Sequence, residues 1–186
     1  MSAPTSLVPG NYVIFAEDPS NTVKTGTLVN GRSNFAVTCP LSSGGNCTIT
    51  TLATTSSASP TQIWLVTGDG MILSKSSSTG QLAQSPTFYM SYSNNSPNIV
   101  TTSAPASPAP TTKFVAQVSQ CVSSSQPVAH AELMAASNKG DTTTYLATLM
   151  TTDLTDQFWT VDDLQNNDIV KANTARSAKN WVFVPV

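Results

Sequence analysis

Short runs of apolar residues separated by turn-forming residues set the pattern of this chain. The run at 11–16 follows Pro9 and Gly10 and is rich in β-branched and aromatic residues, which favours a β-strand. Similar runs recur to the end of the chain. We predict strands at 11–16, 26–29, 35–38, 48–52, 63–66, 71–74, 81–83, 88–92, 113–118, 129–134, 144–149, 158–161, 169–171 and 180–184. The segment 129–134 also fits a short helix, because Ala, Glu, Leu and Met are helix formers.

A Gln-x-Trp motif occurs twice, as Gln62 and Trp64 and again as Gln157 and Trp159. Alternate side chains of a strand share one face, so each amide and indole point the same way. The ring can then pack in the core while the amide bonds backbone. The repetition predicts a fold made of similar β-modules.

The composition agrees with many short strands and narrows the class of protein. The chain has 186 residues, 12 prolines and 9 glycines, and it is rich in Ser and Thr, which suits strands joined by turns. Charged residues make up 10% and the net charge is −2, which speaks against nucleic acid as a partner. The first residues lack a cationic segment followed by an apolar one, and no window reaches membrane-spanning length. We therefore expect a cytoplasmic protein without a membrane span.

Residues that carry chemistry are few. His130 is the only histidine and the cysteines are Cys39, Cys47 and Cys121, an odd number that leaves at least one thiol outside any intrachain bridge. Cys39 and Cys47 flank a turn-prone loop, and the sequence leaves open whether they are bridged or free. No nucleophile elbow, phosphate loop, dinucleotide fingerprint or calcium-loop spacing is found. We expect no catalysis, no metal and no cofactor.

Widely spaced anchor residues resemble those of β-trefoil proteins: Gly10, Tyr12 and Ile14 in an opening strand, Gln62 and Trp64 before Asp69, Gly70 and Ile72, and Trp181 with Phe183 near the end. The resemblance implies an all-β fold, a closed barrel with a hairpin cap and pseudo-threefold symmetry. It implies one domain over 1–186 with modules of about 8–69, 70–120 and 121–186. Either Trp159 or Trp181 can close the third module, and the sequence leaves both versions open.

Within that superfamily the chain looks like the cytosolic fungal branch, which holds the mycocypin-type protease inhibitors and the ricin-B-like lectins. The resemblance to the inhibitors implies a non-catalytic protein that presents loops to a protein target, most directly a protease. By position these loops are 17–25 and 54–61. The candidate protease-binding residues are Asp18, Pro19, Ser20, Asn21, Ser57, Ala58 and Ser59.

The alternative is a carbohydrate-binding lectin. A sugar pocket combines an acid, an aromatic platform and an amide, because sugar hydroxyls need polar partners and the C–H face needs a ring. One such set is Asp69, Tyr89, Tyr92 and Asn94, and another is Tyr145 with Asn167 and Asp168. Neither set stands in the order that ricin-B-like modules show relative to Gln-x-Trp.

Overall fold

The computed structural model describes residues 6–18, 32–52, 59–85, 88–93, 96–103, 112–123, 143–152, 157–174 and 178–186. Regular structure in these residues consists of strands and one short 3-10 helix. The elements are β1 (Gly10–Glu17), β2 (Arg32–Thr38), β3 (Thr48–Thr51), η1 (Pro60–Gln62), β4 (Ile63–Val66), β5 (Ile72–Ser74), β6 (Phe88–Ser93), β7 (Ser96–Ser103), β8 (Phe114–Ser123), β9 (Thr143–Thr151), β10 (Gln157–Thr160), β11 (Asp168–Ile169), β12 (Lys171–Thr174) and β13 (Trp181–Pro185). The all-β prediction is confirmed.

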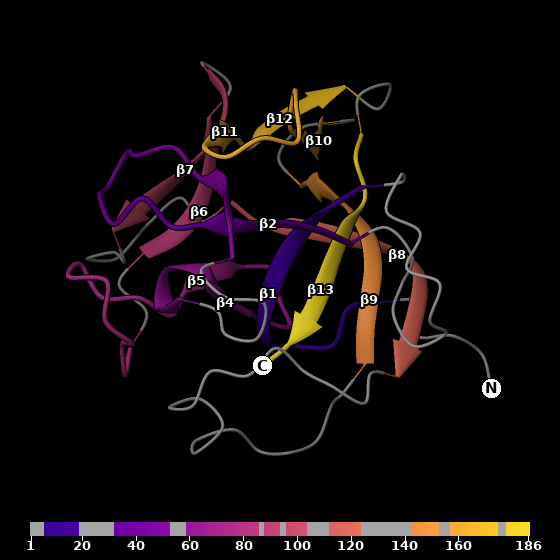
Figure 1. Cartoon of the computed structure of the whole chain (residues 1–186), viewed down its shortest axis with the longest axis horizontal. Helices are drawn as coiled ribbons and strands as arrows, with labels where there is room; N and C mark the ends of the chain where they lie inside the picture. Colours follow the sequence, from indigo (N-terminus) through magenta and orange to yellow (C-terminus); the bar gives the residue numbers. More distant parts are fainter. Residues whose placement is uncertain are drawn as a thin grey trace.

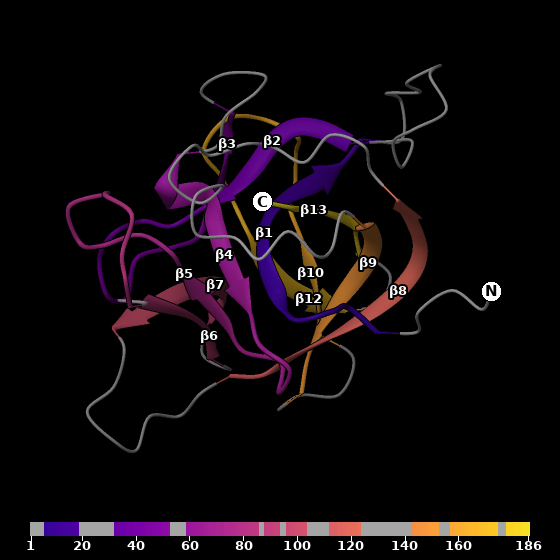
Figure 2. The same ribbon diagram turned by 90° about the horizontal axis from the view of Figure 1, so that it is seen from below.

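The strands form a ring of hydrogen-bonded pairs (Figures 1 and 2). From β1 the order runs through β13, β9, β10, β12, β7, β6, β5 and β4, and β4 pairs with β1 again. A branch leaves β1 through β2 and β3 to β11, while β8 lies beside β9. Closing a sheet on itself protects the edges of most of its strands.

The C-terminal strand completes this ring. In β13, Trp181 lies opposite Ala16 of β1 and Ala147 of β9. Trp159 belongs to β10, which pairs with β9 and β12 instead. Trp181, and not Trp159, thus lies on the strand that pairs with β1.

Three backbone bonds make a small cycle between distant parts of the chain. The amide of Cys47 donates to Ile99 at 2.8 Å, Ile99 donates to Val170 at 2.8 Å, and Val170 donates back to Cys47 at 2.9 Å. All three side chains are fully buried. One residue from each third of the sequence therefore meets the other two at a single point.

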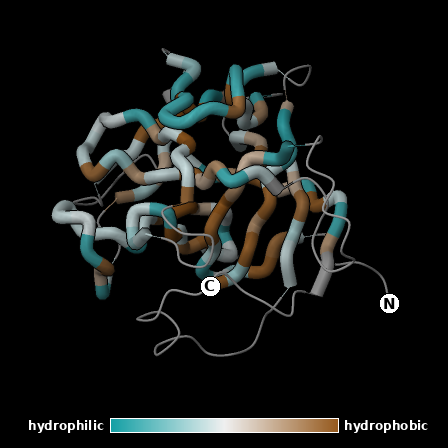
Figure 3. The backbone as a smooth tube through the Cα atoms, in the orientation of Figure 1, coloured by the Kyte–Doolittle hydropathy of each residue, from teal (hydrophilic) through white to brown (hydrophobic). Residues whose placement is uncertain are grey.

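The core surrounds this point and extends along the central strands. Trp64 and Trp159 have no exposed surface, as the motif predicts, and Trp181 is equally buried. On β1, Ile14 packs in the larger core cluster, whereas Val13 packs in a second cluster with residues of β13 and β9. Both faces of β1 are thus buried, and Figure 3 shows apolar residues following β1, β13 and β9.

Some predicted elements differ from the structure. Strand β7 (Ser96–Ser103) is not predicted, because its turn-forming and hydroxyl residues hide the alternation of buried and exposed positions. The predicted strand 81–83 is wrong, since only an isolated bridge joins Leu82 to Ser76, just after a tight turn at Gly80. The predicted segments 26–29 and 129–134 lie outside the described residues.

Candidate functional site

The two predicted inhibitor loops leave the sheet side by side. Glu17 lies opposite Arg32 where β1 ends and β2 begins. At the same end of β2, the amide of Leu52 donates to the carbonyl of Asn34 at 3.0 Å, just after β3 ends. The segment 19–31 therefore joins β1 to β2 at this end, and the segment 53–58 leaves β3 at the same end and finishes before η1. We call this end of the sheet, defined by Glu17, Arg32, Leu52 and Asn180, the loop edge.

Asn180 ties the loop edge to the last strand. Its side-chain amide donates to Oε2 of Glu17 at 2.9 Å, and its carbonyl accepts from the amide of Glu17 at 3.1 Å. Glu17 is thereby held on both its backbone and its side chain. The end of β1 is fixed where the first loop departs.

Ser59 and Gln62 fix the point where the second loop returns. Ser59 caps η1: its hydroxyl accepts from the amide of Thr61, while its own amide donates to Oε1 of Gln62. This reciprocal arrangement is a capping box. The amide nitrogen of Gln62 reaches Oγ1 of Thr50 at 3.0 Å and the carbonyl of Thr50 at 3.4 Å. Gln62 thus joins the return of the loop to β3, the strand from which the loop leaves.

The motif behaves as predicted in its first copy. Gln62 is only 3% exposed and bonds backbone, and Nε1 of Trp64 donates to the carbonyl of Val37 at 2.9 Å. In the second copy Gln157 is half-buried, and Nε1 of Trp159 has no hydrogen-bond partner. In both copies the indole ring is fully buried, but only the N–H of Trp64 has a hydrogen-bond partner.

The structure describes two of the seven candidate protease-binding residues. Asp18 follows directly on β1 and borders the loop edge, whereas Ser59 caps η1, which bonds to Cys39 just after the other end of β2. The other five lie outside the described residues: Pro19, Ser20, Asn21, Ser57 and Ala58. Sequence position predicts the loops, whereas strand register alone brings their ends together.

The candidate glycan-binding residues are not brought together around an exposed ring. Tyr89 is 3% exposed and Tyr92 is half-buried against the core. Asp69 lies in the turn between β4 and β5 and lines a pocket that neither tyrosine borders. Asn94 lies outside the described residues. In the second set Tyr145 is 1% exposed, so neither its face nor that of Tyr89 is free to stack on a sugar.

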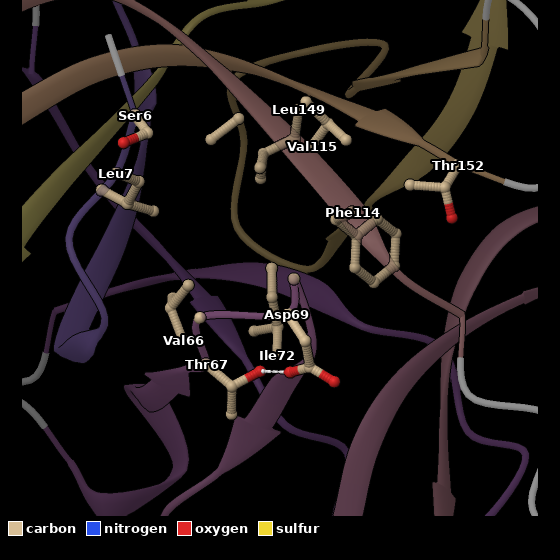
Figure 4. Close-up of a pocket in the computed structure, with 13 residues that line it drawn as sticks. Ser6, Leu7, Val66, Thr67, Asp69, Ile72, Phe114, Val115, Leu149 and Thr152 are labelled. Atoms are coloured by element: carbon tan, nitrogen blue, oxygen red, sulfur yellow. Dashed lines mark hydrogen bonds between the residues drawn. The ribbon is translucent and has the colours of Figure 1, made fainter. Parts of the chain in front are cut away.

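The pocket beside Asp69 is shown in Figure 4 and has a volume of about 280 Å³. Its walls are mainly apolar and come from the segment before β1, the β4–β5 turn, the start of β8 and the end of β9. Asp69 accepts a hydrogen bond from Thr67 at 2.5 Å and lies 3.5 Å from the ammonium of Lys113. The Thr67 hydroxyl and then the Lys113 charge lower the pKa of Asp69. A carboxylate and an ammonium thus mark the rim of an apolar hollow.

The remaining candidate chemistry is structural where it is described. Cys39 and Cys47 are free thiols in the core. Asp168 begins β11, and its carboxylate accepts from the amides of Asp163 and Ile169, which gives it a structural role. Among the described residues no group of His, Cys, Asp and Glu is arranged to hold a metal, and no helix there is long and apolar enough to span a bilayer. His130 lies outside the described residues.

This chain resembles known proteins in its structure but not in its sequence. No protein-family model and no curated protein matches it. Three solved chains do, and one of them comes from work entitled "Structure and mode of action of a mosquitocidal holotoxin". The match has a TM-score of 0.52 at 11% identity and covers 97% of this chain but 18% of the toxin chain. At that identity the likeness concerns the fold alone, and this chain spans less than a fifth of the toxin.

Proposed function

We propose that this chain is a non-catalytic binding protein that presents two adjacent loops to a protein target, most directly a protease. The observation that carries the proposal is the loop edge. One loop leaves β1 at Glu17 and enters β2 at Arg32, and the other leaves the neighbouring β3 at Leu52 at the same end of the sheet. Two neighbouring loops can meet the two walls of a protease cleft together.

The scaffold suits this role because it fixes the loop ends before binding. A binding loop loses conformational entropy when it is ordered against a target, and anchoring its ends lowers that loss. The first loop is held by strand pairing and by Asn180. The second is held by the capping box and the Gln62 bonds to Thr50. Both therefore start from defined positions on a packed core.

The proposal includes a β-trefoil scaffold with three modules of about 8–69, 70–120 and 121–186. The bond cycle through Cys47, Ile99 and Val170 supports it, since each module would supply one equivalent residue. The ring of strands in which β13 returns to β1 supports it as well. The mycocypin-type inhibitors, which the sequence resembles, place their binding loops at the corresponding positions.

The direct test is inhibition. The purified chain is titrated against a papain-like, a trypsin-like and a pepsin-like protease, and we expect tight inhibition of one class with no cleavage of the loops. Asn21→Arg and Ser57→Arg place a bulky charge in the two loops and should each weaken inhibition at least about tenfold. Ser78→Arg is the matched control, since Ser78 is exposed in another turn, and it should inhibit like the wild type.

A glycan array run on the same preparation separates the alternative. A hapten-blocked glycan signal without inhibition would replace the proposal with the lectin function. Inhibition that survives both loop substitutions would place the protease contact elsewhere on the molecule. Silence in both assays would reject both functions and leave the scaffold unassigned.

A further inference from the structure

A second surface, separate from the loop edge, lies along β8. This ten-residue strand pairs with β9 along its length, and none of the other strands in the described residues forms a ladder with its other side. Its first residue already uses that side: the amide of Phe114 donates to the carbonyl of Gly70 at 2.8 Å. The free side of β8 can therefore bond a backbone that is not part of the sheet.

The register shows which backbone groups this side offers. Lys113 accepts from Thr152 on the β9 side, whereas Phe114 donates away from β9. Antiparallel neighbours alternate between bonded and non-bonded pairs, so Ala116 and Val118 also direct their N–H and C=O groups away from β9. A bulge between Val118 and Gln120 ends this run. The result is a short row of donors and acceptors that no strand among the described residues pairs with.

The composition of the strand leaves this row accessible. Exposed edge strands are commonly blocked by charged residues or proline, but Phe114–Ser123 contains neither. Val115 is 42% exposed, and Gln117 and Ser119 are exposed on the same face. An uncharged edge of this length is a template for pairing with another strand.

The pocket of Figure 4 adjoins the start of this edge. Phe114, Val115 and Ala116 line it together with the β4–β5 turn and Leu149. A residue paired opposite Ala116 would place its side chain on the face of Ala116 and Leu149, where the pocket lies. Its volume of about 280 Å³ falls just below the usual range for drug-sized ligands. It suits one large apolar side chain.

We propose that the free edge of β8 and this pocket bind an extended segment of a partner polypeptide, which adds a strand to β8 and inserts one large apolar side chain. The backbone row selects an extended peptide, because only another main chain matches its alternating donors and acceptors. The charges beside the pocket select little for the charge of the peptide, because Asp69 and Lys113 already pair with each other at 3.5 Å. Hydrogen bonding and apolar burial therefore carry the recognition.

The pocket and the loop edge lie at opposite ends of β1. Gly10 pairs with Val66, which lines the pocket, and Glu17 pairs with Arg32 at the loop edge. Seven steps along a strand span about 23 Å. Binding at one surface is thus testable independently of the other.

The test selects peptides from a phage-displayed library of random linear heptapeptides against the full chain, and the best binder is then synthesised. We expect an apolar residue flanked by strand-forming residues. Val115→Trp narrows the pocket mouth and should weaken binding of that peptide at least about tenfold. Gln117→Trp, which places the same ring on the same face outside the pocket, should leave it within about twofold.

A second variant tests the backbone. Ala116→Pro removes the N–H on the free side, and proline is tolerated on that side of an edge strand, so binding should fall at least about tenfold. If Ala116→Pro fails to fold, the tryptophan pair decides alone. Selection of no peptide, or equal binding to wild type and Val115→Trp, would overturn the proposal. So would a wild-type dimer in analytical ultracentrifugation that Val115→Trp makes monomeric, because the edge would then serve a second copy of this chain.

Discussion

At the scale of single residues, the two copies of the Gln-x-Trp motif make different hydrogen bonds. Trp64 donates to the carbonyl of Val37, and Gln62 ties η1 to β3. The indole N–H of Trp159 is buried without a partner, and Gln157 is half-buried. A buried donor without a partner loses its hydrogen bonds to water and gains none in the protein, which destabilises the folded state. The first copy therefore stabilises its surroundings through hydrogen bonds and the second through packing alone.

This difference predicts unequal costs for the same substitution. Trp64→Phe leaves the carbonyl of Val37 without its donor, which costs about 1–3 kcal/mol beyond the loss of ring volume. Trp159→Phe removes an unpaired donor, so its loss is confined to packing against Phe114 and Trp181. Urea melts should show the larger loss of unfolding free energy for Trp64→Phe. Equal losses would show that the Val37 bond contributes nothing net.

Gly70 is a second residue whose identity is dictated by its contacts. Its φ is +87°, and a Cβ there would lie 2.5 Å from the carbonyl oxygen of Phe114. Gly44 has a similar φ of +79° with nothing within 4 Å of a Cβ. Gly44→Ala should cost about 1–2 kcal/mol for the left-handed backbone alone. Gly70→Ala should cost clearly more in the same melts, because the seam between the β4–β5 turn and β8 must open.

At the scale of elements, strand pairing decides which backbone groups are protected. Within β8, Val115 and Gln117 face β9, whereas Ala116 and Val118 face the free side. Hydrogen–deuterium exchange read by NMR should therefore alternate along β8. The amide of Ala116 should exchange at least about tenfold faster than those of its two neighbours. Uniformly slow exchange would mean that the free side is covered, and the proposed peptide site would lose its basis.

The burial of a strand determines whether the sequence alone could predict it. β1 and β13 have apolar runs because both of their faces are covered, and such runs are visible in the letters. In β7 the buried positions include Ile99 and Thr101, which lie between polar neighbours. Because one of these buried residues is a threonine, the alternation of buried and exposed positions does not appear as an alternation of apolar and polar residues. Elements with one polar face need their partners before they can be recognised.

The candidate site was predictable in its parts but not in its arrangement. Turn-forming residues mark both of the loops that are proposed to bind a protease. Their adjacency depends on the register of β1, β2 and β3, which is set by pairing between distant residues. The glycan hypothesis meets a related obstacle: the sequence offers Tyr89 as an aromatic platform, yet its side chain on β6 is buried. The sequence gives the residue types, whereas the pairing of strands determines which way each side chain points.

At the scale of the whole molecule, the closed core controls the chemistry of its thiols. Burial raises the pKa of Cys47 well above its ordinary value near 9, helped by the neighbouring Cys39, whose own pKa is also raised by burial. A disulfide reagent at neutral pH should modify the half-buried Cys121 first and reach Cys39 and Cys47 only after unfolding. Rapid modification of all three in the native protein would contradict this packing.

The same thiols give stability a defined pH dependence. Unfolded thiols ionise near pH 9, while the folded state holds Cys47 protonated. The folded chain then binds more protons, so stability is full below pH 9 and falls as pH rises above it. Urea midpoints at pH 7 and pH 10 should differ less in Cys47→Ala than in the wild type. An unchanged difference would assign the alkaline loss to other groups.

Closure of the ring predicts that the three thirds of the chain unfold together. Trp64 reports on the N-terminal part of the chain and Trp159 and Trp181 on the C-terminal part, yet all three belong to one core cluster that also holds Met90 and Phe114 from the middle. Removing any third would break both the bond cycle and the return of β13 to β1. Tryptophan fluorescence and far-ultraviolet circular dichroism should therefore follow one urea transition with a common midpoint. Two separated transitions would mean that a module folds by itself, and the single-domain description would have to be divided at that module.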